Sequence, residues 1–257
     1  PGMEVFHITP AEFDHGGTRD RAARMSQADY LLFMTQDAVP EDPHLIRRMM
    51  EAMEVAPDVR AAYARQLPRP DCRIEEQYTR RFNYPEESCV KRKSDLMRLG
   101  IKTYFCSNVC AVYDRETYCR LGGFPDRAIF NEDMIFAAKL IQNGYAVVYA
   151  ANARVIHSHN YSAIQQFHRN FDLAVSQADH PEVFSGLRSE GEGIRLVKNT
   201  AAFLIRERKP WRIVGLIWNS GWKYLGYLLG KRYRKLPRSW VLRFTMNRRY
   251  WEKDWQN

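Results

Sequence analysis

The sequence predicts an α/β fold followed by a basic, helical C-terminal extension. Segments with helical periodicity alternate with short apolar runs of strand length, the order typical of α/β domains. The 257 residues are 45% hydrophobic and 27% charged, a globular composition that excludes a disordered or fibrous chain. The net charge of +9 is uneven: residues 1–187 carry 22 Lys and Arg against 25 Asp and Glu, whereas residues 188–257 carry 17 against 5. A tail of that sign favours phosphate-bearing partners.

The first four predicted elements alternate between helix and strand. Thr18 is a suitable cap for a helix that runs to about Ala28. Residues 30–34 form a continuous apolar run, which predicts a strand buried on both faces of a parallel sheet. Residues 43–53 are predicted to form the second helix, which Pro43 begins, and residues 59–64 the next strand.

The same alternation continues after a charged stretch, residues 68–104, in which a helix is predicted at 74–82. Asn131 caps a helix whose apolar residues recur at helical spacing and which Gly144 terminates. The chain beyond Tyr161 is predicted to be helical. The other predicted elements are a strand at 109–113, a helix at 115–121, and strands at 146–149 and 154–156.

The five cysteines do not predict a zinc ribbon or a disulfide-stapled secreted fold, because their number is odd and no Cys-x-x-Cys pair occurs. A reducing, cytoplasmic environment is therefore expected. No apolar run approaches the ~18–20 residues of a membrane span. The sequence opens at Pro1-Gly2 without an initiator Met, so we expect a processed chain or a part of a longer protein.

A candidate cation ligand, Asp37, follows the predicted strand 30–34 in the segment Thr35-Gln36-Asp37. Ligands of open α/β sheets bind at the carboxyl ends of strands, and a hard divalent cation on a diphosphate needs only one or two protein carboxylates. The alternative is that Asp37 simply begins a turn before Pro40.

Two acids, Glu132 and Asp133, open the helix that Asn131 caps. One of them is a candidate general base for an attacking hydroxyl, and the helix N-terminus is expected to keep it ionised at neutral pH. The alternative is that both merely complement the helix dipole.

Two histidines, His157 and His159, lie at the end of the strand predicted at 154–156. A neutral imidazole there would complete a metal shell begun by Asp37, although strand-end histidines are also common surface residues. A further candidate is Gly16-Gly17, which leads into a helix beside Arg19 and offers free backbone amides to a phosphate, or else forms an ordinary turn.

The order and spacing of these motifs resemble the family 2 glycosyltransferases, in particular their bacterial rhamnosyltransferase-like branch. The likeness covers nearly the whole chain, including the tail. It implies a GT-A fold, a Rossmann-like mixed sheet flanked by helices, in residues 1–160, and a basic, aromatic helical region in residues 161–257. The segments that carry the resemblance are HGGTR (15–19), FMTQDA (33–38), FCSN (105–108), LGGF (121–124), NEDM (131–134) and VIHSHNYS (155–162).

Carried over by position, the resemblance implies a role for each motif. Asp133 matches the catalytic base, with Glu132 beside it, and Asp37 and His157 match the residues that hold Mg²⁺ or Mn²⁺ on the donor diphosphate. Arg19 matches an arginine near the nucleotide. The remaining implied residues are His15, Gly16, Gly17, Asp20 and Gln36 on the donor side, and Ser107, Asn108, Gly122 and Gly123 on the acceptor side.

The chain departs from the family pattern at three places. Thr35 replaces one of the two acids of the usual metal-binding motif, and Asp20 stands where the family usually has Asn. The usual opening, a βαβ unit of roughly 30 residues or more, is absent, so an N-terminal truncation is expected.

The resemblance implies an inverting glycosyltransferase that moves a sugar, a deoxyhexose such as rhamnose, from a dTDP- or UDP-sugar to a hydroxyl of a glycan or lipid-linked acceptor in cell-envelope polysaccharide synthesis. The alternatives are an inactive fragment that serves in assembly and a nucleic-acid-binding or lipid-binding module. No RNA- or DNA-binding motif supports the nucleic-acid alternative. The aromatic residues and Lys/Arg cluster of the tail predict peripheral contact with an anionic membrane at its inner face, unless the aromatics pack inward.

Overall fold

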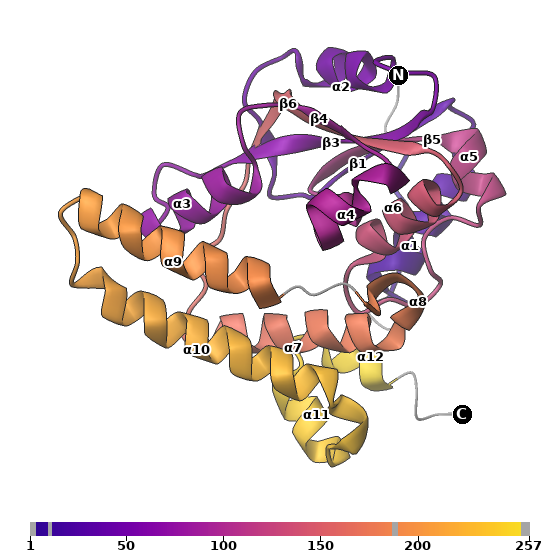
Figure 1. Ribbon diagram of the computed structural model, residues 1–257. Helices are drawn as coiled ribbons and strands as arrows, with labels where there is room; N and C mark the ends of the chain where they lie inside the picture. Colours follow the sequence, from indigo (N-terminus) through magenta and orange to yellow (C-terminus); the bar gives the residue numbers. More distant parts are fainter. Residues whose placement is uncertain (1–3, 10–11, 187–189, 253–257) are drawn as a thin grey trace.

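The structure of the chain is a computed structural model that describes residues 4–9, 12–186 and 190–252 (Figure 1). In these residues a mixed sheet of six strands has the order β1-β5-β3-β6-β2, with β4 also paired to β6. The β3–β6 pair is parallel and the other pairs are antiparallel. The strands are β1 Tyr30–Met34, β2 Val39–Pro40, β3 Val59–Leu67, β4 Cys89–Lys91, β5 Cys110–Asp114 and β6 Ala146–Ile156.

Helices cover both faces of this sheet (Figure 1). On one face, Met49 of α2 (Leu45–Met53) belongs to a core shared with β3, β5 and β6. On the other face, Phe136 of α6 (Glu132–Gln142) packs with Tyr113 of β5 in a larger, aromatic core. The predicted α/β class, a mixed sheet flanked by helices with a helical C-terminal region, is confirmed.

The C-terminal helices pack onto this α/β unit, since Val183 and Phe184 of α8 belong to the aromatic core. The division of the chain at residue 160 stays a prediction. No helix in the described ranges is long and apolar enough to span a membrane. The helices not yet given are α1 His15–Met25, α3 Ile74–Asn83, α4 Leu96–Leu99, α5 Arg115–Arg120, α7 Ala163–Asp179, α8 Pro181–Phe184, α9 Glu190–Arg206, α10 Arg212–Lys231, α11 Arg238–Phe244 and α12 Arg248–Glu252, with 3₁₀ turns at Lys93–Asp95, Gly100–Tyr104 and Tyr233–Lys235.

The expectation of a doubly buried parallel strand at 30–34 is wrong. β1 pairs antiparallel with β5 and has no second neighbour among the described strands, so it is an edge strand. Leu31 is buried, but Tyr30, Leu32 and Met34 are exposed. An unbroken apolar run therefore did not indicate burial on both faces here.

Two boundaries also differ from the sequence prediction. α1 begins at His15 rather than after Thr18, because the Asp14 carboxylate accepts a hydrogen bond from the Gly17 amide and caps the helix. The two strands predicted around residue 150 are one strand, β6, whose register against β3 shifts after Ala150.

The helices α7 and α10 lie against each other at backbone distance (Figure 1). A Cβ atom on Gly226 would lie 2.3 Å from the carbonyl oxygen of Phe167, and one on Gly230 would lie 2.3 Å from that of Phe171. The two glycines are one helical turn apart on the face that α10 turns toward α7. Because they lack a Cβ atom, these glycines let the backbones of α10 and α7 come into contact.

We expect Gly226→Ala to lower the melting temperature, because the added methyl must push the two helices apart at a cost of about 1–3 kcal/mol. Gly215→Ala on the same helix is the matched control, since its Cβ would meet open space. It should raise the melting temperature slightly, because Ala is favoured over Gly in a helix by up to about 1 kcal/mol. Equal shifts of both variants in a thermal melt would contradict the close packing.

Candidate active site

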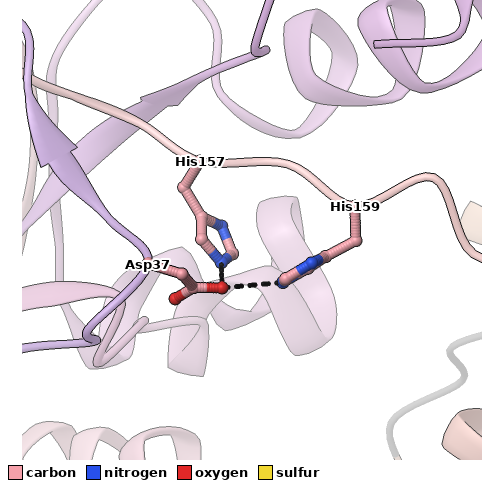
Figure 2. Close-up of side chains that lie close together, drawn as sticks. All are labelled: Asp37, His157 and His159. Carbon is pink, nitrogen blue, oxygen red and sulfur yellow. Dashed lines mark ion pairs between the residues drawn. The ribbon is translucent and has the colours of Figure 1, made fainter. Parts of the chain in front are cut away.

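Three potential metal ligands meet at one end of the sheet: Asp37, His157 and His159 (Figure 2). The Nε2 atoms of His157 and His159 lie 3.4 Å and 3.3 Å from Asp37 Oδ2. β2 pairs with the end of β6, with Val39 opposite Ile156, which brings the loop after β1 beside the histidines. The two histidines are two residues apart in the segment that follows β6, and both imidazoles face Asp37 (Figure 2).

All three side chains favour the protonation state of a metal ligand. Burial and the nearby Arg80 lower the pKa of His157 to about 4, although Asp37 raises it. Burial also lowers the pKa of His159. Burial raises the pKa of Asp37, but Thr35 and the two imidazoles outweigh that effect and hold the pKa below its usual value. At neutral pH the cluster therefore presents two neutral imidazoles and one carboxylate.

A buried glutamine, Gln66 of β3, orients His157. Its Oε1 accepts a hydrogen bond from Arg80 and lies 3.0 Å from His157 Nδ1. Because Arg80 has only donors, the atom facing it is the oxygen, and His157 Nδ1 must carry the proton. The lone pair of Nε2 then points at the Asp37 carboxylate. The Nε2 lone pair and the Asp37 Oδ2 atom, 3.4 Å apart, are then two acceptors that face each other, and a bound cation would stabilise this arrangement.

A second cluster surrounds the two acids at the start of α6. Asp133 Oδ2 accepts from the amide of Asn108 at 2.9 Å, and Glu132 Oε1 accepts from Arg19 at 2.9 Å. The side chain of Asn108 donates to the same Glu132 oxygen and accepts from Tyr113. Asn131, which precedes the helix, has a left-handed backbone (φ 64°) and no side-chain capping bond. The helix start is therefore held by tertiary hydrogen bonds.

The expectation that the helix N-terminus keeps Asp133 ionised with a low pKa is wrong. Burial, with Glu132 next to it, raises the pKa of Asp133 to about 7, and the hydrogen bonds from the Asn108 and Met134 amides do not offset this. Low-dielectric surroundings and a like charge outweigh the helix end. A carboxylate with such a pKa suits proton transfer at neutral pH.

Hydrogen bonds link the two clusters. Gln66, which holds His157, donates through Nε2 to Ser107 Oγ at 2.9 Å. The next residue, Asn108, holds Asp133 and Glu132. A hydrogen-bonded path thus runs from His157, which faces Asp37, through Gln66 and the 107–108 segment to the acids of α6.

Several predicted donor-side residues make structural contacts instead. The Asp20 carboxylate accepts from Tyr118 and pairs with Arg24, rather than meeting the Asp37 cluster. A Cβ on Gly16 would lie 2.5 Å from the carbonyl oxygen of Pro125, so this glycine allows a close loop contact. The amide of its neighbour Gly17 donates a hydrogen bond to the Asp14 carboxylate, which caps α1.

The remaining predicted residues, His15, Gln36, Gly122 and Gly123, have different surroundings. His15 lies beside Glu132 and Arg19, and burial, despite the opposing effect of Glu132, lowers its pKa. Gln36 is exposed. Gly122 and Gly123 have φ of +83° and +68°, and a Cβ on Gly123 would lie 2.0 Å from Asp20 Oδ1. These two glycines are required by a turn.

Two residues are absent from the site predicted by the sequence: His159, which belongs to the metal cluster, and Gln66, which orients His157. The sequence assigns the metal to Asp37 and His157, and His159 appears there only as the second histidine after the strand, although its spacing of two from His157 is a signal for it. Gln66 is a polar residue at the end of an apolar strand, and its role depends on contacts to Arg80 and Ser107 that lie far away in the sequence.

Sequence comparisons with known proteins identify the family. The sequence model of glycosyl transferase family 2 matches residues 2–122. The O-antigen chain rhamnosyltransferase WbaN of Salmonella anatum is 41% identical over 251 residues, 96% of this chain and 78% of the relative. The O-antigen chain rhamnosyltransferase RfbN of Salmonella typhimurium is 41% identical over 253 residues, which are 97% of this chain and 79% of the relative. A solved mannosyltransferase of Pyrobaculum calidifontis, in complex with GDP-Man and Mn²⁺, aligns over 93% of this chain and 66% of its own at 16% identity and a TM-score of 0.46.

Proposed function

This chain belongs to glycosyl transferase family 2, and on that premise we propose that it moves a deoxyhexose such as rhamnose from a dTDP- or UDP-sugar to a hydroxyl of a glycan acceptor, with inversion. The 41% identity to two O-antigen chain rhamnosyltransferases supports the sugar and a role in polysaccharide synthesis. The observation that carries the proposal is the hydrogen-bonded path between the Asp37 cluster and Asp133. This path supports the proposal because it links the candidate cation ligands to the candidate base.

The donor set of the first cluster fits a divalent cation. Asp37, His157 and His159 offer one carboxylate oxygen and two imidazole nitrogens within 4.8 Å of one another. Two nitrogens make Mg²⁺, which prefers oxygen ligands, a poorer fit than Mn²⁺. When bound, the cation neutralises charge on the leaving diphosphate.

Asp133 is the proposed base. Its carboxylate takes the proton of the acceptor hydroxyl while that oxygen forms the new bond to the anomeric carbon. The bond from this carbon to the diphosphate oxygen breaks, and its electron pair leaves with the nucleoside diphosphate. Glu132, which Arg19 and Asn108 hold, anchors the start of the helix that carries the base, and its charge helps to raise the pKa of Asp133. No covalent enzyme intermediate is required.

A transfer assay tests this function. We expect the protein with Mn²⁺ to transfer sugar from dTDP-rhamnose to a glycan acceptor, with EDTA removing the activity and the product having the opposite anomeric configuration by NMR. UDP-glucose serves as the matched donor control. The absence of both transfer and donor hydrolysis, with the protein folded and Mn²⁺ present, would argue against the proposal.

The proposed acceptor is lipid-linked, which requires contact with the inner face of the membrane. Trp211, Val214 and Trp218 follow one another at helical spacing along α10 and are 68%, 75% and 63% exposed. The outer face of α10 is thus aromatic and apolar, and exposed bases lie at its C-terminal end and just beyond it: Lys231, Arg232, Arg234 and Lys235. Aromatic anchors beside a basic cluster suit the surface of an anionic bilayer.

We expect the protein to co-sediment with vesicles that contain anionic phosphatidylglycerol and to bind neutral phosphatidylcholine vesicles much less. Trp218→Glu should weaken this binding, since it puts a charge in the apolar stripe. Glu54→Gln, at an exposed position after α2, is the control. Equal sedimentation with neutral and anionic vesicles, or no effect of Trp218→Glu, would remove the membrane from the proposal.

A further inference from the structure

A basic side chain of α7, Arg169, lies one ring away from the Asp37 cluster. Its guanidinium carbon is 4.5 Å from the ring centre of Phe130 and 5.9 Å from that of Tyr161. The Tyr161 ring is in turn stacked on His159 at 4.8 Å. Within the described ranges Arg169 has no ion pair and no hydrogen bond, so only ring faces contact its charge.

A second basic side chain, Lys223, comes from α10. Its neighbours Trp222 and Gly226 both contact Phe167 of α7, two residues before Arg169. Lys223 is half-buried, and no described residue pairs with its ammonium group. Burial lowers the pKa of Lys223, with Arg169 and Arg80 acting in the same direction and Glu76 opposing them. Gly226, one helical turn after Lys223, contacts the Phe167 backbone, so Lys223 lies on the part of α10 that packs against α7.

The third cation is Arg80 of α3, which reaches the same region. It donates to Gln66 and forms an ion pair with Glu76 at 2.8 Å. Gln66 Oε1 lies 3.0 Å from His157 Nδ1, so a single side chain separates Arg80 from the Asp37 cluster.

Of these three cations, Arg80 alone forms an ion pair within the described ranges, with Glu76. Partly buried charges without counterions are costly, and proteins keep them where a ligand supplies the opposite charge. Stacking on rings leaves the N–H edges of an arginine free, and those edges match phosphate oxygens in pairs. A lysine ammonium adds a point charge that phosphate also accepts.

We propose that Arg80, Arg169 and Lys223 form a diphosphate-binding subsite beside the Asp37 cluster, so that the C-terminal helices complete the site. This inference rests on the proposed function and deepens it. Because α10 also carries the exposed aromatic stripe on its other side, the diphosphate has two possible sources: the nucleotide donor and a lipid-linked acceptor. The nucleotide donor and the lipid-linked acceptor would each present diphosphate oxygens to the three cations.

Inorganic pyrophosphate with Mn²⁺ is the first probe, measured by calorimetry on the whole chain. Arg169→Gln and Lys223→Met should each weaken its binding by about tenfold, the usual cost of a charge-assisted hydrogen bond. Arg243→Gln and Lys198→Met, at exposed positions of α11 and α9, are the matched controls and should leave the affinity unchanged. Arg169→Lys and Lys223→Arg keep the charge and should recover part of the binding, and melting curves verify that each variant folds.

Two further arms identify the source. If the variants lose affinity for dTDP with Mn²⁺, the subsite holds the donor diphosphate. If they lose binding to vesicles that contain a polyprenyl diphosphate, compared with vesicles that lack it, the subsite holds the acceptor.

Unchanged pyrophosphate affinity in folded Arg169→Gln and Lys223→Met, or no pyrophosphate binding by the wild type, overturns the inference. Failure of the proposed function looks different. A wild type that binds pyrophosphate through these residues but transfers no sugar retains the subsite and loses the transferase proposal.

Discussion

Asp133→Asn is expected to reduce sugar transfer by about 10²–10⁴-fold, the usual contribution of a general base. The amide has the size of the carboxylate but cannot take the hydroxyl proton. Both carboxylate oxygens of Asp133 accept backbone hydrogen bonds, from Asn108 and Met134, and one of these is lost in the amide. We therefore expect a small loss of stability with the fold retained, measured by circular dichroism and a transfer assay.

The control for this substitution is Asp126→Asn, an exposed acid in the loop before α6, which should transfer normally. The pH profile supplies a second check. Because burial raises the pKa of Asp133 to about 7, the base is protonated below that pH and kcat/KM should rise as the pH rises to about 7. That rise belongs to the coupled Glu132–Asp133 pair. Wild-type turnover in Asp133→Asn, with the same rise, would exclude Asp133 as the base.

Asp37→Ala is expected to remove Mn²⁺ binding and, with it, transfer. Asp37 supplies the only carboxylate of the metal cluster in the described part of the chain, and both imidazoles face it. Loss of a partner that orients a metal ligand typically costs about 10–100-fold in affinity or activity, and loss of the ligand itself should cost more. Mn²⁺ titration by electron paramagnetic resonance measures this independently of activity.

Gln66→Leu provides the graded comparison in the same titration. It removes the oxygen that holds the proton on His157 Nδ1, so the roughly 10–100-fold loss typical of such orienting partners is expected. His44→Ala, at an exposed position before α2, is the control and should bind Mn²⁺ as the wild type does. Equal Mn²⁺ affinity in Asp37→Ala and in the wild type would place the cation elsewhere.

The elements of the fold with strong local signals were predictable from the sequence. The helix after Asn131 has apolar residues at helical spacing, and the structure has it as α6, Glu132–Gln142. The strand at 109–113 is β5, shifted by one residue. Both signals lie within the segment itself, and so does the spacing that places His157 and His159 together.

Other features could not be derived from local patterns. The exposure of β1 depends on which strands pair with it. The start of α1 depends on the hydrogen bond that the Asp14 carboxylate accepts from the Gly17 amide. The raised pKa of Asp133 arises from burial beneath the 107–108 segment and from Glu132. None of these is encoded by the periodicity of a single segment.

The sequence by itself determined the family, the alternation of helices and strands, and the identity of the acids and histidines that carry the proposed chemistry. Only the tertiary structure decided the environment of these groups: which tautomer Gln66 imposes on His157, how far burial shifts the pKa of Asp133, and which cation of α7 lies near the Asp37 cluster. The physical reason is that periodicity and motif spacing are local properties of the chain. Desolvation and charge–charge interactions depend on distances between residues that are remote in sequence, and folding alone sets those distances.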